Sequence, residues 1–220
     1  MNMKLPIKGV LGLGKESTLY YLNLIQEKHK SFFGNDATCP LILYQVDFEE
    51  VNPFLPNQFS VLMPVVENYL RQIEKMGITR LLIPNITLHE TLDQINFQGF
   101  VCHPVTLTLQ YLEENKISQA CIFGTSYTMN SDYMKKKFSD KDIKLLSPTN
   151  NDQIWIDDFR KEVYERKPSS DRILAFQMLI RKYAVENPVI IGCTELSLFS
   201  FKNDASCIDM ADLQVEEFLK

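Results

Sequence analysis

The sequence lacks the long apolar segments and the paired cysteines that mark membrane and disulfide-rich proteins. None of its windows reaches about 18 consecutive apolar residues, and the opening MNMKLPIKGVLGLG has too short an apolar run for a signal peptide. The five cysteines are odd in number and scattered, without a C-x-x-C pair, which argues against a disulfide framework and a zinc site. We therefore expect a soluble, cytoplasmic protein with no membrane partner.

Positive charge is also scarce. The net charge is −5 and the pI is about 5.3, whereas proteins that bind nucleic acids concentrate Lys and Arg on one face. The densest basic run, Met134–Phe138, is short and flanked by acids, which is typical of a solvated helix face. The three histidines show no ligand spacing. These features predict no nucleic-acid partner and no bound metal.

What the sequence does contain is a series of short apolar runs with helical segments between them. Apolar residues make up 45% of the 220 positions, enough for one large domain or two small ones. Runs of four to eight Val, Ile and Leu residues followed by amphipathic segments indicate parallel strands with crossover helices, and therefore an α/β fold. The predicted helices are Glu16–Phe33, Gln58–Met76, Val105–Asn115, Thr128–Phe138, Asp152–Glu165 and Ser170–Glu186.

Two strand ends recur about half the chain apart. RLLIPNITLHE is predicted to end its strand at Asn85, and PVIIGCTELSL at Cys193. This spacing suggests two similar lobes that present equivalent strand ends to each other. In open α/β sheets, ligands bind beyond the carboxyl ends of the strands. The polar residues that follow the apolar runs are mostly Gly, Thr, Ser and Asn, which can donate hydrogen bonds to a carboxylate.

The glycine-rich segment GVLGLGKEST is neither a dinucleotide fingerprint nor a P-loop. It lacks the third glycine of G-x-G-x-x-G, and Lys15 is followed by Glu16 rather than by Ser or Thr. A tight strand-to-helix turn at Gly14 explains the glycines. Such a turn can also leave backbone amides free to bind a carboxylate or phosphate, and the sequence leaves both roles open.

Cys193 has the setting of a working thiol. Gly192 permits a ligand to approach the backbone, Thr194 supplies a donor, and the amides of a following helix would lower the thiol pKa toward neutrality. A buried free cysteine is just as often an inert part of a core, so both interpretations stay open. The same holds for His89, which follows the other strand end and can either transfer protons or pack.

Together, these strand-end motifs resemble the aspartate/glutamate racemase family of the wider Asp/Glu/hydantoin racemase superfamily. VIIGCTEL is similar to the second catalytic motif of that family almost residue for residue, and it is the most specific of the similarities. The weaker ones extend the resemblance over nearly the whole chain: GVLGLGKESTLYYLNLI, LILYQVDFEEV, GTSYTMNSDYMKKKF and CIDMADLQVEEFL.

The resemblance implies two Rossmann-like α/β lobes with parallel sheets, related by a pseudo-twofold axis, with the site in the cleft between them. We assign residues 1–103 and 205–220 to the N-terminal lobe and residues 104–204 to the C-terminal lobe. Enzymes of this family use neither PLP nor another cofactor. One cysteine thiolate removes the α-proton of the substrate, and a second thiol returns a proton to the opposite face. A homodimer is also implied.

By this resemblance Cys193 corresponds to the second cysteine, whereas Asn85 stands where the family has its first. The chain is thus a variant that lacks one thiol, and an amide cannot exchange a proton as a thiol does. We predict that Cys193, Asn85 and His89 are the catalytic positions. The predicted substrate-binding residues are Gly14, Thr87, Thr125, Ser126, Thr194, Glu195 and Lys167.

Three functions follow from this variant. The favoured one is a PLP-independent amino-acid racemase that acts on aspartate, glutamate or a related small acid, with Cys193 as acid/base on one face and activity impaired by Asn85. The second is a single-cysteine decarboxylase of the arylmalonate type, which protonates a carbanion on one face. The third is a catalytically inactive protein that binds an acidic amino acid.

Overall fold

The apolar runs form two separate four-stranded sheets in the computed structural model, which describes residues 6–165 and 168–220. The first sheet contains β1 (Lys8–Gly12), β2 (Ile42–Gln45), β3 (Arg80–Leu82) and β4 (Phe100–Val101). The second contains β5 (Gln119–Phe123), β6 (Lys144–Leu146), β7 (Val189–Ile191) and β8 (Cys207–Asp209). All neighbouring strands in both sheets are parallel, which confirms the predicted α/β class.

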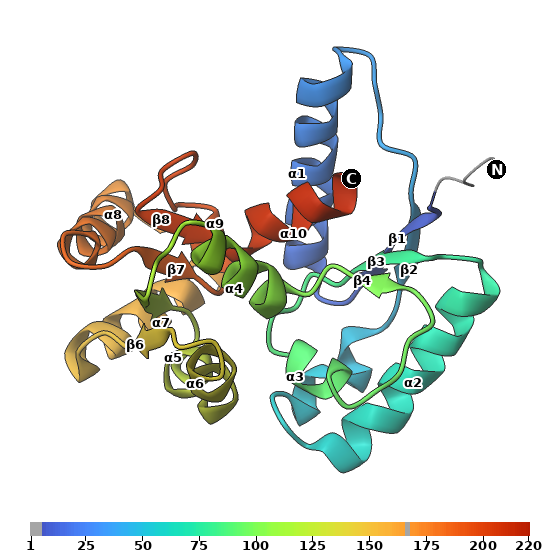
Figure 1. Ribbon diagram of the computed structural model, residues 1–220, viewed down its shortest axis with the longest axis horizontal. Coiled ribbons are helices and arrows are strands. Elements are labelled where there is room, and N and C mark those ends of the chain that lie inside the picture. The colour runs from blue at the N-terminus through green and yellow to red at the C-terminus, as the bar shows by residue number, and fades with distance from the viewer. Residues whose placement is uncertain (1–5, 166–167) are drawn as a thin grey trace. The chain divides into compact units, whose positions relative to one another are not determined.

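The two sheets have the same topology. The strand orders are β2-β1-β3-β4 and β6-β5-β7-β8. In each sheet, the first strand along the chain lies between the second and the third, and the fourth forms an edge. Helices connect the strands (Figure 1): α1 (Lys15–Phe33), α2 (Phe59–Lys75), α3 (His89–Leu92), α4 (Pro104–Glu114), α5 (Ser126–Asn130), α6 (Asp132–Ser139), α7 (Asn150–Glu165), α8 (Ser170–Ala184), α9 (Thr194–Ser197) and α10 (Met210–Leu219). Two short 3₁₀ helices, Phe48–Glu50 and Asn52–Phe54, precede α2.

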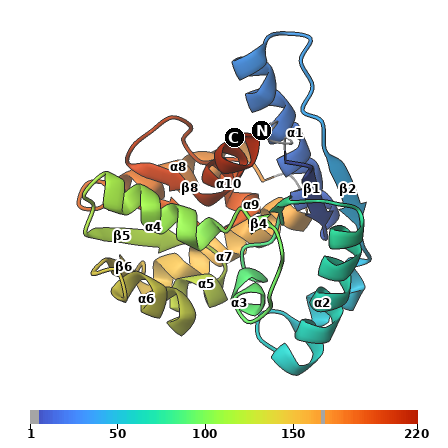
Figure 2. The ribbon, with the colours of Figure 1, turned by 45° about the vertical axis from the view of Figure 1, so that its right-hand side comes forward.

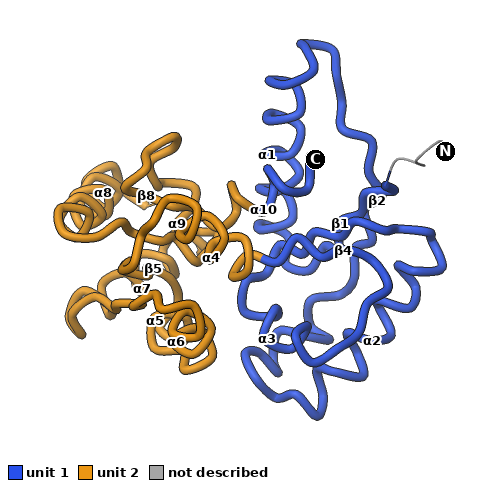
Figure 3. Tube along the Cα trace, viewed as in Figure 1, with its two compact units in different colours: residues 1–103, 214–220 blue, residues 104–213 orange. Residues whose placement is uncertain are grey.

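The chain divides into two compact units, one built on each sheet (Figure 3). Unit 1 comprises the residues up to His103 together with Gln214–Lys220, and unit 2 comprises Pro104–Leu213. The sequence placed the return to the first lobe at residue 205. The structure places it at Gln214, because β8 pairs with β7 and keeps the preceding residues in unit 2.

In unit 1, α2 covers one face of the sheet. Its buried residues recur at helical spacing, with Leu62, Val66, Leu70 and Ile73 all nearly inaccessible to solvent. They pack against alternate residues of β1 and β3, including Leu81. Burial of each such side chain stabilises the fold by roughly 1.5–3 kcal/mol relative to exposure, so the α2 stripe anchors this face of the sheet.

The C-terminal residues are fastened to unit 1 through Gln214. The Tyr21 hydroxyl of α1 donates to Gln214 Oε1 at 2.6 Å, and Gln214 Nε2 donates to the carbonyl of Cys102 at 2.7 Å. Gln214 is fully buried. From the end of α1 the chain returns to β2 through a long extended segment, visible in Figures 1 and 2.

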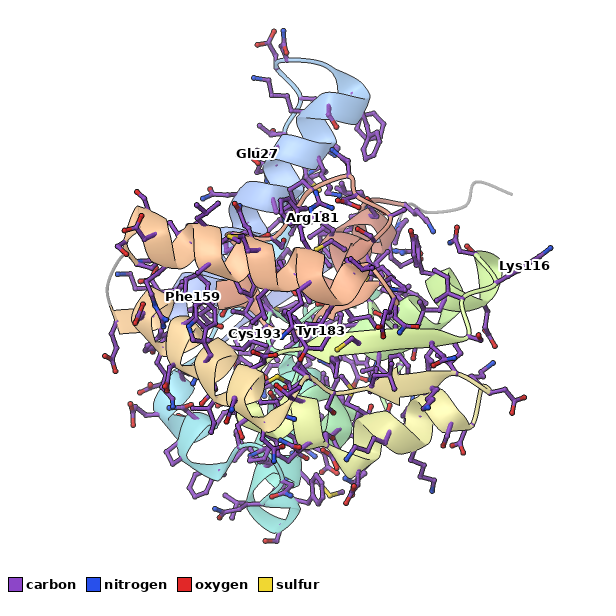
Figure 4. The ribbon with its side chains drawn as sticks, turned by 90° about the vertical axis from the view of Figure 1, so that its left-hand side faces the viewer. Glu27, Lys116, Phe159, Arg181, Tyr183 and Cys193 are labelled. Atoms are coloured by element: carbon purple, nitrogen blue, oxygen red, sulfur yellow. The ribbon has the colours of Figure 1, made fainter. Side chains whose placement is uncertain are left out.

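In unit 2, α7 and α8 cover one face of the sheet, and Figure 4 views the protein from their side. Phe159 of α7 stacks on Phe176 of α8 with ring centroids 4.7 Å apart, and both contact strand residues such as Phe123. Cys193 belongs to the same apolar cluster. The residue that follows the strand β7 is therefore held by the core of its own unit.

Most predicted helices agree with the structure to within two residues, but the helix expected over Thr128–Phe138 is two helices. Ser131 interrupts it with extended backbone angles (φ −60°, ψ 121°) and accepts a hydrogen bond from the Met134 amide. The serine caps α6 and thereby ends α5. The strands are also shorter than predicted: β3 ends at Leu82 and β7 at Ile191.

Within the described residues, none of the helices combines the length and apolarity needed to cross a membrane.

We predict that Gln214→Ala destabilises unit 1. It removes two buried hydrogen bonds, to the Tyr21 hydroxyl and to the Cys102 carbonyl, which should lower the free energy of unfolding by about 2–4 kcal/mol. Urea denaturation followed by circular dichroism measures this change. The matched control is Glu216→Ala on the same helix, which removes only a half-exposed ion pair with Lys28 and should cost less than about 1 kcal/mol. If the two substitutions lower the free energy of unfolding equally, Gln214 does not hold the C-terminal residues on unit 1 in the way described.

Candidate active site

In unit 2, the ends of β5 and β7 lie side by side. Phe123 and Ile191 are paired in register, and the Gly192 amide donates to the Phe123 carbonyl at 2.7 Å. A Cβ atom at Gly124 would stand 2.9 Å from the Thr128 side chain, so this position requires glycine. The next residues along the two strands are Thr125 and Cys193, which the register brings to the same edge of the sheet.

Cys193 is fixed in position on all sides. It precedes α9 with extended backbone angles, and its carbonyl accepts the amides of Leu196 and Ser197 at 3.1 Å. Its thiol donates to Glu195 Oε2 at 2.8 Å. Only 6% of the residue is exposed, and it packs in the same cluster as Phe159 (Figure 4). The Cys193 thiol can therefore donate a proton, and the Glu195 carboxylate beside it can accept one.

The electrostatics of Cys193 differ from the sequence expectation. Burial raises the pKa of the Cys193 thiol well above its usual range, and the Glu195 carboxylate raises it further, while the Arg160 guanidinium and the Glu195 amide oppose the rise. The predicted lowering toward neutrality is wrong, because α9 has only four residues and its amides cannot outweigh burial beside a carboxylate. The thiol is therefore protonated at neutral pH.

Thr125 and Ser126 follow β5 at this edge. The Thr125 hydroxyl accepts the Thr128 amide at 3.0 Å and caps α5, so it already has a structural task. The Ser126 side chain is exposed, and its amide donates to Asp157 Oδ1 at 3.3 Å. Thr194 is buried at the start of α9, and Glu195 is partly exposed. Unit 2 thus gathers five of the predicted residues at one sheet edge.

Sequence reasoning missed two charged residues beside this edge. Asp157 of α7 accepts from the Ser126 amide and from Arg160 Nε, at 3.1 Å in the latter case. Burial alone would raise the pKa of Asp157, but hydrogen bonds from Lys161 and Arg160 outweigh it and lower that pKa. In the sequence these residues lie within a helix, where charges at i, i+3 and i+4 usually indicate an exposed ion-pair network.

In unit 1, Gly14 and Asn85 follow the paired strands β1 and β3. Gly14 is the N-cap of α1, its carbonyl accepts from the amide and hydroxyl of Thr18, and no side chain caps the first amides of the helix. Thr87 is partly buried in the turn before α3. The strand ends of unit 1 therefore also gather the predicted residues, as a group of their own.

Asn85 uses its side chain to start a helix. Its Oδ1 accepts the Leu88 amide at 2.9 Å, and its carbonyl lies 2.8 Å from His89 Nδ1. Because a carbonyl can only accept, His89 carries its proton on Nδ1. This strand end of unit 1 therefore has a side chain that accepts from the backbone and does not titrate.

His89 is fully buried and has no hydrogen-bond partner at Nε2 among the described residues. Its ring meets His103 edge to face with centroids 4.7 Å apart. Burial, followed by the proximity of His103, lowers the pKa of His89 well below its usual value. In this structure, His89 is a neutral packing residue that orients the Asn85 turn.

Lys167, the remaining predicted residue, lies outside the described residues. Within the part of the chain that the structure describes, no group of three or more His, Cys, Asp or Glu side chains is placed to hold one metal ion.

Comparison with known proteins now bears on the fold. No model of a known protein family matches the chain. Its structure is similar to that of a Yersinia pestis protein provisionally assigned as an Asp/Glu racemase, with a TM-score of 0.83 and 22% identity over 98% of each chain. For an aspartate racemase homologue from Pyrococcus horikoshii OT3, the TM-score is 0.81 and the sequence identity is 20%, over 97% of each chain. For the Picrophilus torridus aspartate racemase, the TM-score is 0.68 and the sequence identity is 16%, over 94% of this chain and 89% of that one.

The chain has the fold of the aspartate/glutamate racemases. The racemase fold implied by the sequence motifs is thus confirmed, with its two parallel sheets and their covering helices. Identities near 20% do not carry substrate or residue roles from one racemase fold to another, so these rest on the chemistry of the site.

We predict that the burial of His89 makes the protein sensitive to mild acid. The unfolded chain takes up a proton at this histidine below about pH 6.5, whereas the folded chain does not until the much lower folded pKa. The free energy of unfolding should therefore fall as pH decreases from 6.5 toward 5. In His89→Gln, urea denaturation at several pH values should give a flatter dependence. Parallel curves for the two proteins would contradict a buried neutral His89.

We also predict that Cys193 alkylation has a raised pH midpoint. Only the thiolate reacts with iodoacetamide, so the rate at Cys193 should rise with a midpoint above the value near 8.5 of a free cysteine. Glu195→Gln should move the midpoint to lower pH, because the neutral amide no longer opposes the thiolate. Mass spectrometry of the Cys193 peptide separates it from the other four cysteines. Identical profiles for both proteins would show that Glu195 does not act on this thiol.

Proposed function

We propose that this chain is a cofactor-independent, racemase-like enzyme that acts on aspartate, glutamate or a related small acid, with Cys193 as acid/base on one face. The observation that carries the proposal is the hydrogen bond from the Cys193 thiol to Glu195, at a strand end of a racemase fold. Removal of a proton next to a carboxylate needs a strong base held in a dry setting, and a buried thiol beside a carboxylate provides one.

In the proposed cycle, each proton passes between Glu195, Cys193 and the substrate. The Glu195 carboxylate takes the thiol proton of Cys193, which leaves a thiolate and a carboxylic acid. The thiolate then removes the α-proton of the substrate and becomes a thiol again, and the substrate becomes a carbanion. The Cys193 thiol exchanges its hydrogen with solvent and then returns a proton to the same face of the carbanion, which restores the substrate and leaves a thiolate. Glu195 gives its proton back to this thiolate, so that the resting thiol and carboxylate form again. In heavy water this cycle replaces the α-hydrogen by deuterium.

Asn85 limits what this cycle can do. In the proposal, inversion requires a second proton donor for the opposite face, and an amide whose oxygen accepts from the Leu88 backbone cannot serve as one. We therefore expect exchange without inversion to be the main reaction. The roles of Gly14, Thr87 and Lys167 in substrate binding stay predictions from the sequence motifs.

The test is exchange of the α-hydrogen in D2O, followed by NMR, for both enantiomers of aspartate and glutamate. We expect the wild type to exchange one enantiomer of at least one acid with retention. Cys193→Ala should lower the rate by about 10²–10⁴-fold, the usual effect of losing a catalytic acid or base. Cys207→Ala is the matched control, since this thiol is also buried in unit 2 but follows no glycine at a strand end.

Asn85→Cys extends the same experiment. It supplies a second thiol at the position of the first cysteine, and chiral chromatography should then detect inverted product alongside deuterium. Inversion by the wild type itself would show that another group already supplies the second proton. Exchange that persists in Cys193→Ala would overturn the assignment of Cys193.

One observation favours a second function. The Cys193 thiol is protonated at neutral pH, which suits a decarboxylase that only has to protonate a carbanion on one face. If none of the four amino acids exchanges, release of CO2 from a substituted arylmalonate by the wild type, and its loss in Cys193→Ala, would support the decarboxylase. Binding of an acidic amino acid without either reaction would leave an inactive binding protein.

A further inference from the structure

Arg160 is a largely covered cation of unit 2 that, among the described residues, uses only one of its three nitrogens. Its Nε donates to Asp157 Oδ1 at 3.1 Å. Within the described residues, its two terminal nitrogens make no hydrogen bond, although only 22% of the side chain is exposed. A guanidinium held at one nitrogen and open at the other two offers a paired set of donors.

The packing of α7 against α5 places Arg160 at the strand ends. The two helices run in opposite directions: Asn130 at the end of α5 donates to Gln153 Oε1 at 2.8 Å, and the Ser126 amide at its start donates to Asp157. Arg160 lies a further turn along α7 and so passes the start of α5, toward the residues that follow β5. Helix α7 also contacts α9, which begins directly after Cys193.

The neighbours of Arg160 orient it and leave its terminal nitrogens open. Asp157 accepts from Arg160 and also pairs with Lys161 at 2.9 Å, and Lys161 pairs in addition with Asp158 at 3.3 Å. The Ser126 amide adds a further donor to Asp157. Asp157 therefore holds Arg160 through Nε alone and shares its charge among several donors. The influence of the guanidinium also reaches the thiol, because it opposes the rise in the Cys193 pKa.

We propose that Arg160 is a specificity-determining residue that binds a carboxylate of the ligand beside Cys193. The inference rests on the proposed function for the identity of the ligand, an acidic amino acid. Two parallel N–H donors match the two oxygens of a carboxylate, a geometry that lysine cannot reproduce. Either the α-carboxylate or the side-chain carboxylate of the substrate has this chemistry.

The test is the binding of L-aspartate and L-asparagine by isothermal titration calorimetry. Arg160→Gln should weaken aspartate binding by at least about tenfold, and Arg160→Lys should restore only part of it. A loss confined to aspartate assigns the side-chain carboxylate, whereas an equal loss for asparagine assigns the α-carboxylate. Unchanged aspartate binding in Arg160→Gln, or no aspartate binding by the wild type, would overturn the proposal.

Lys161→Gln is the matched control, because Lys161 is the next residue, carries the same charge and shares the partner Asp157, but is half-exposed. Aspartate binding should change by less than about twofold in this variant. Thermal melting by circular dichroism verifies that each variant folds. Should Arg160→Gln not fold, Arg160→Lys serves in its place, with loss of the paired donors expected to weaken binding several-fold.

A second readout needs neither ligand nor turnover. Arg160→Gln should raise the pH midpoint of Cys193 alkylation, and Lys161→Gln should not, which a merely structural role of Arg160 would not predict. The two proposals can fail separately. Aspartate binding that depends on Arg160, without deuterium exchange or inversion, would refute the racemase-like function and keep the role of Arg160. Deuterium exchange that depends on Cys193 but not on Arg160 would support the racemase-like function and refute the role of Arg160.

Discussion

The parallel pairing of β5 with β7 is the constraint on which the candidate site depends. Gly192 bonds to the Phe123 carbonyl, and Gly124 leaves no space for a larger side chain beside Thr128. Because the two strands end together at glycines, the residues that follow them must share one edge of the sheet. Cys193 and Thr125 become neighbours through backbone register, and α7 then adds its charges to the same edge.

At Cys193, burial competes with local charge, and burial prevails. The thiol packs in the apolar cluster of unit 2, where a thiolate would lose its hydration, and Glu195 adds a repulsive charge. Arg160 and a backbone amide oppose these effects without reversing them. The resting site therefore holds its proton on sulfur, and in the proposed cycle Glu195 is the group that accepts it.

In unit 1, the side chain at the corresponding strand end starts a helix. Asn85 accepts from the Leu88 amide and starts α3, and its carbonyl positions a buried, neutral His89. A thiol at this position would accept that amide only weakly. Asn85 thus serves as a helix start at this strand end, in a sheet that has the racemase topology.

The α/β class and the glycine-rich strand ends could be predicted from the sequence, because apolar runs and turn residues act over a few positions. The break at Ser131 could not be predicted in this way. The direction of the Cys193 pKa shift became clear from the folded structure, as did the burial of His89 and the place of Arg160. Each of these depends on which side chains pack together from distant segments, and no local pattern of residues records such contacts.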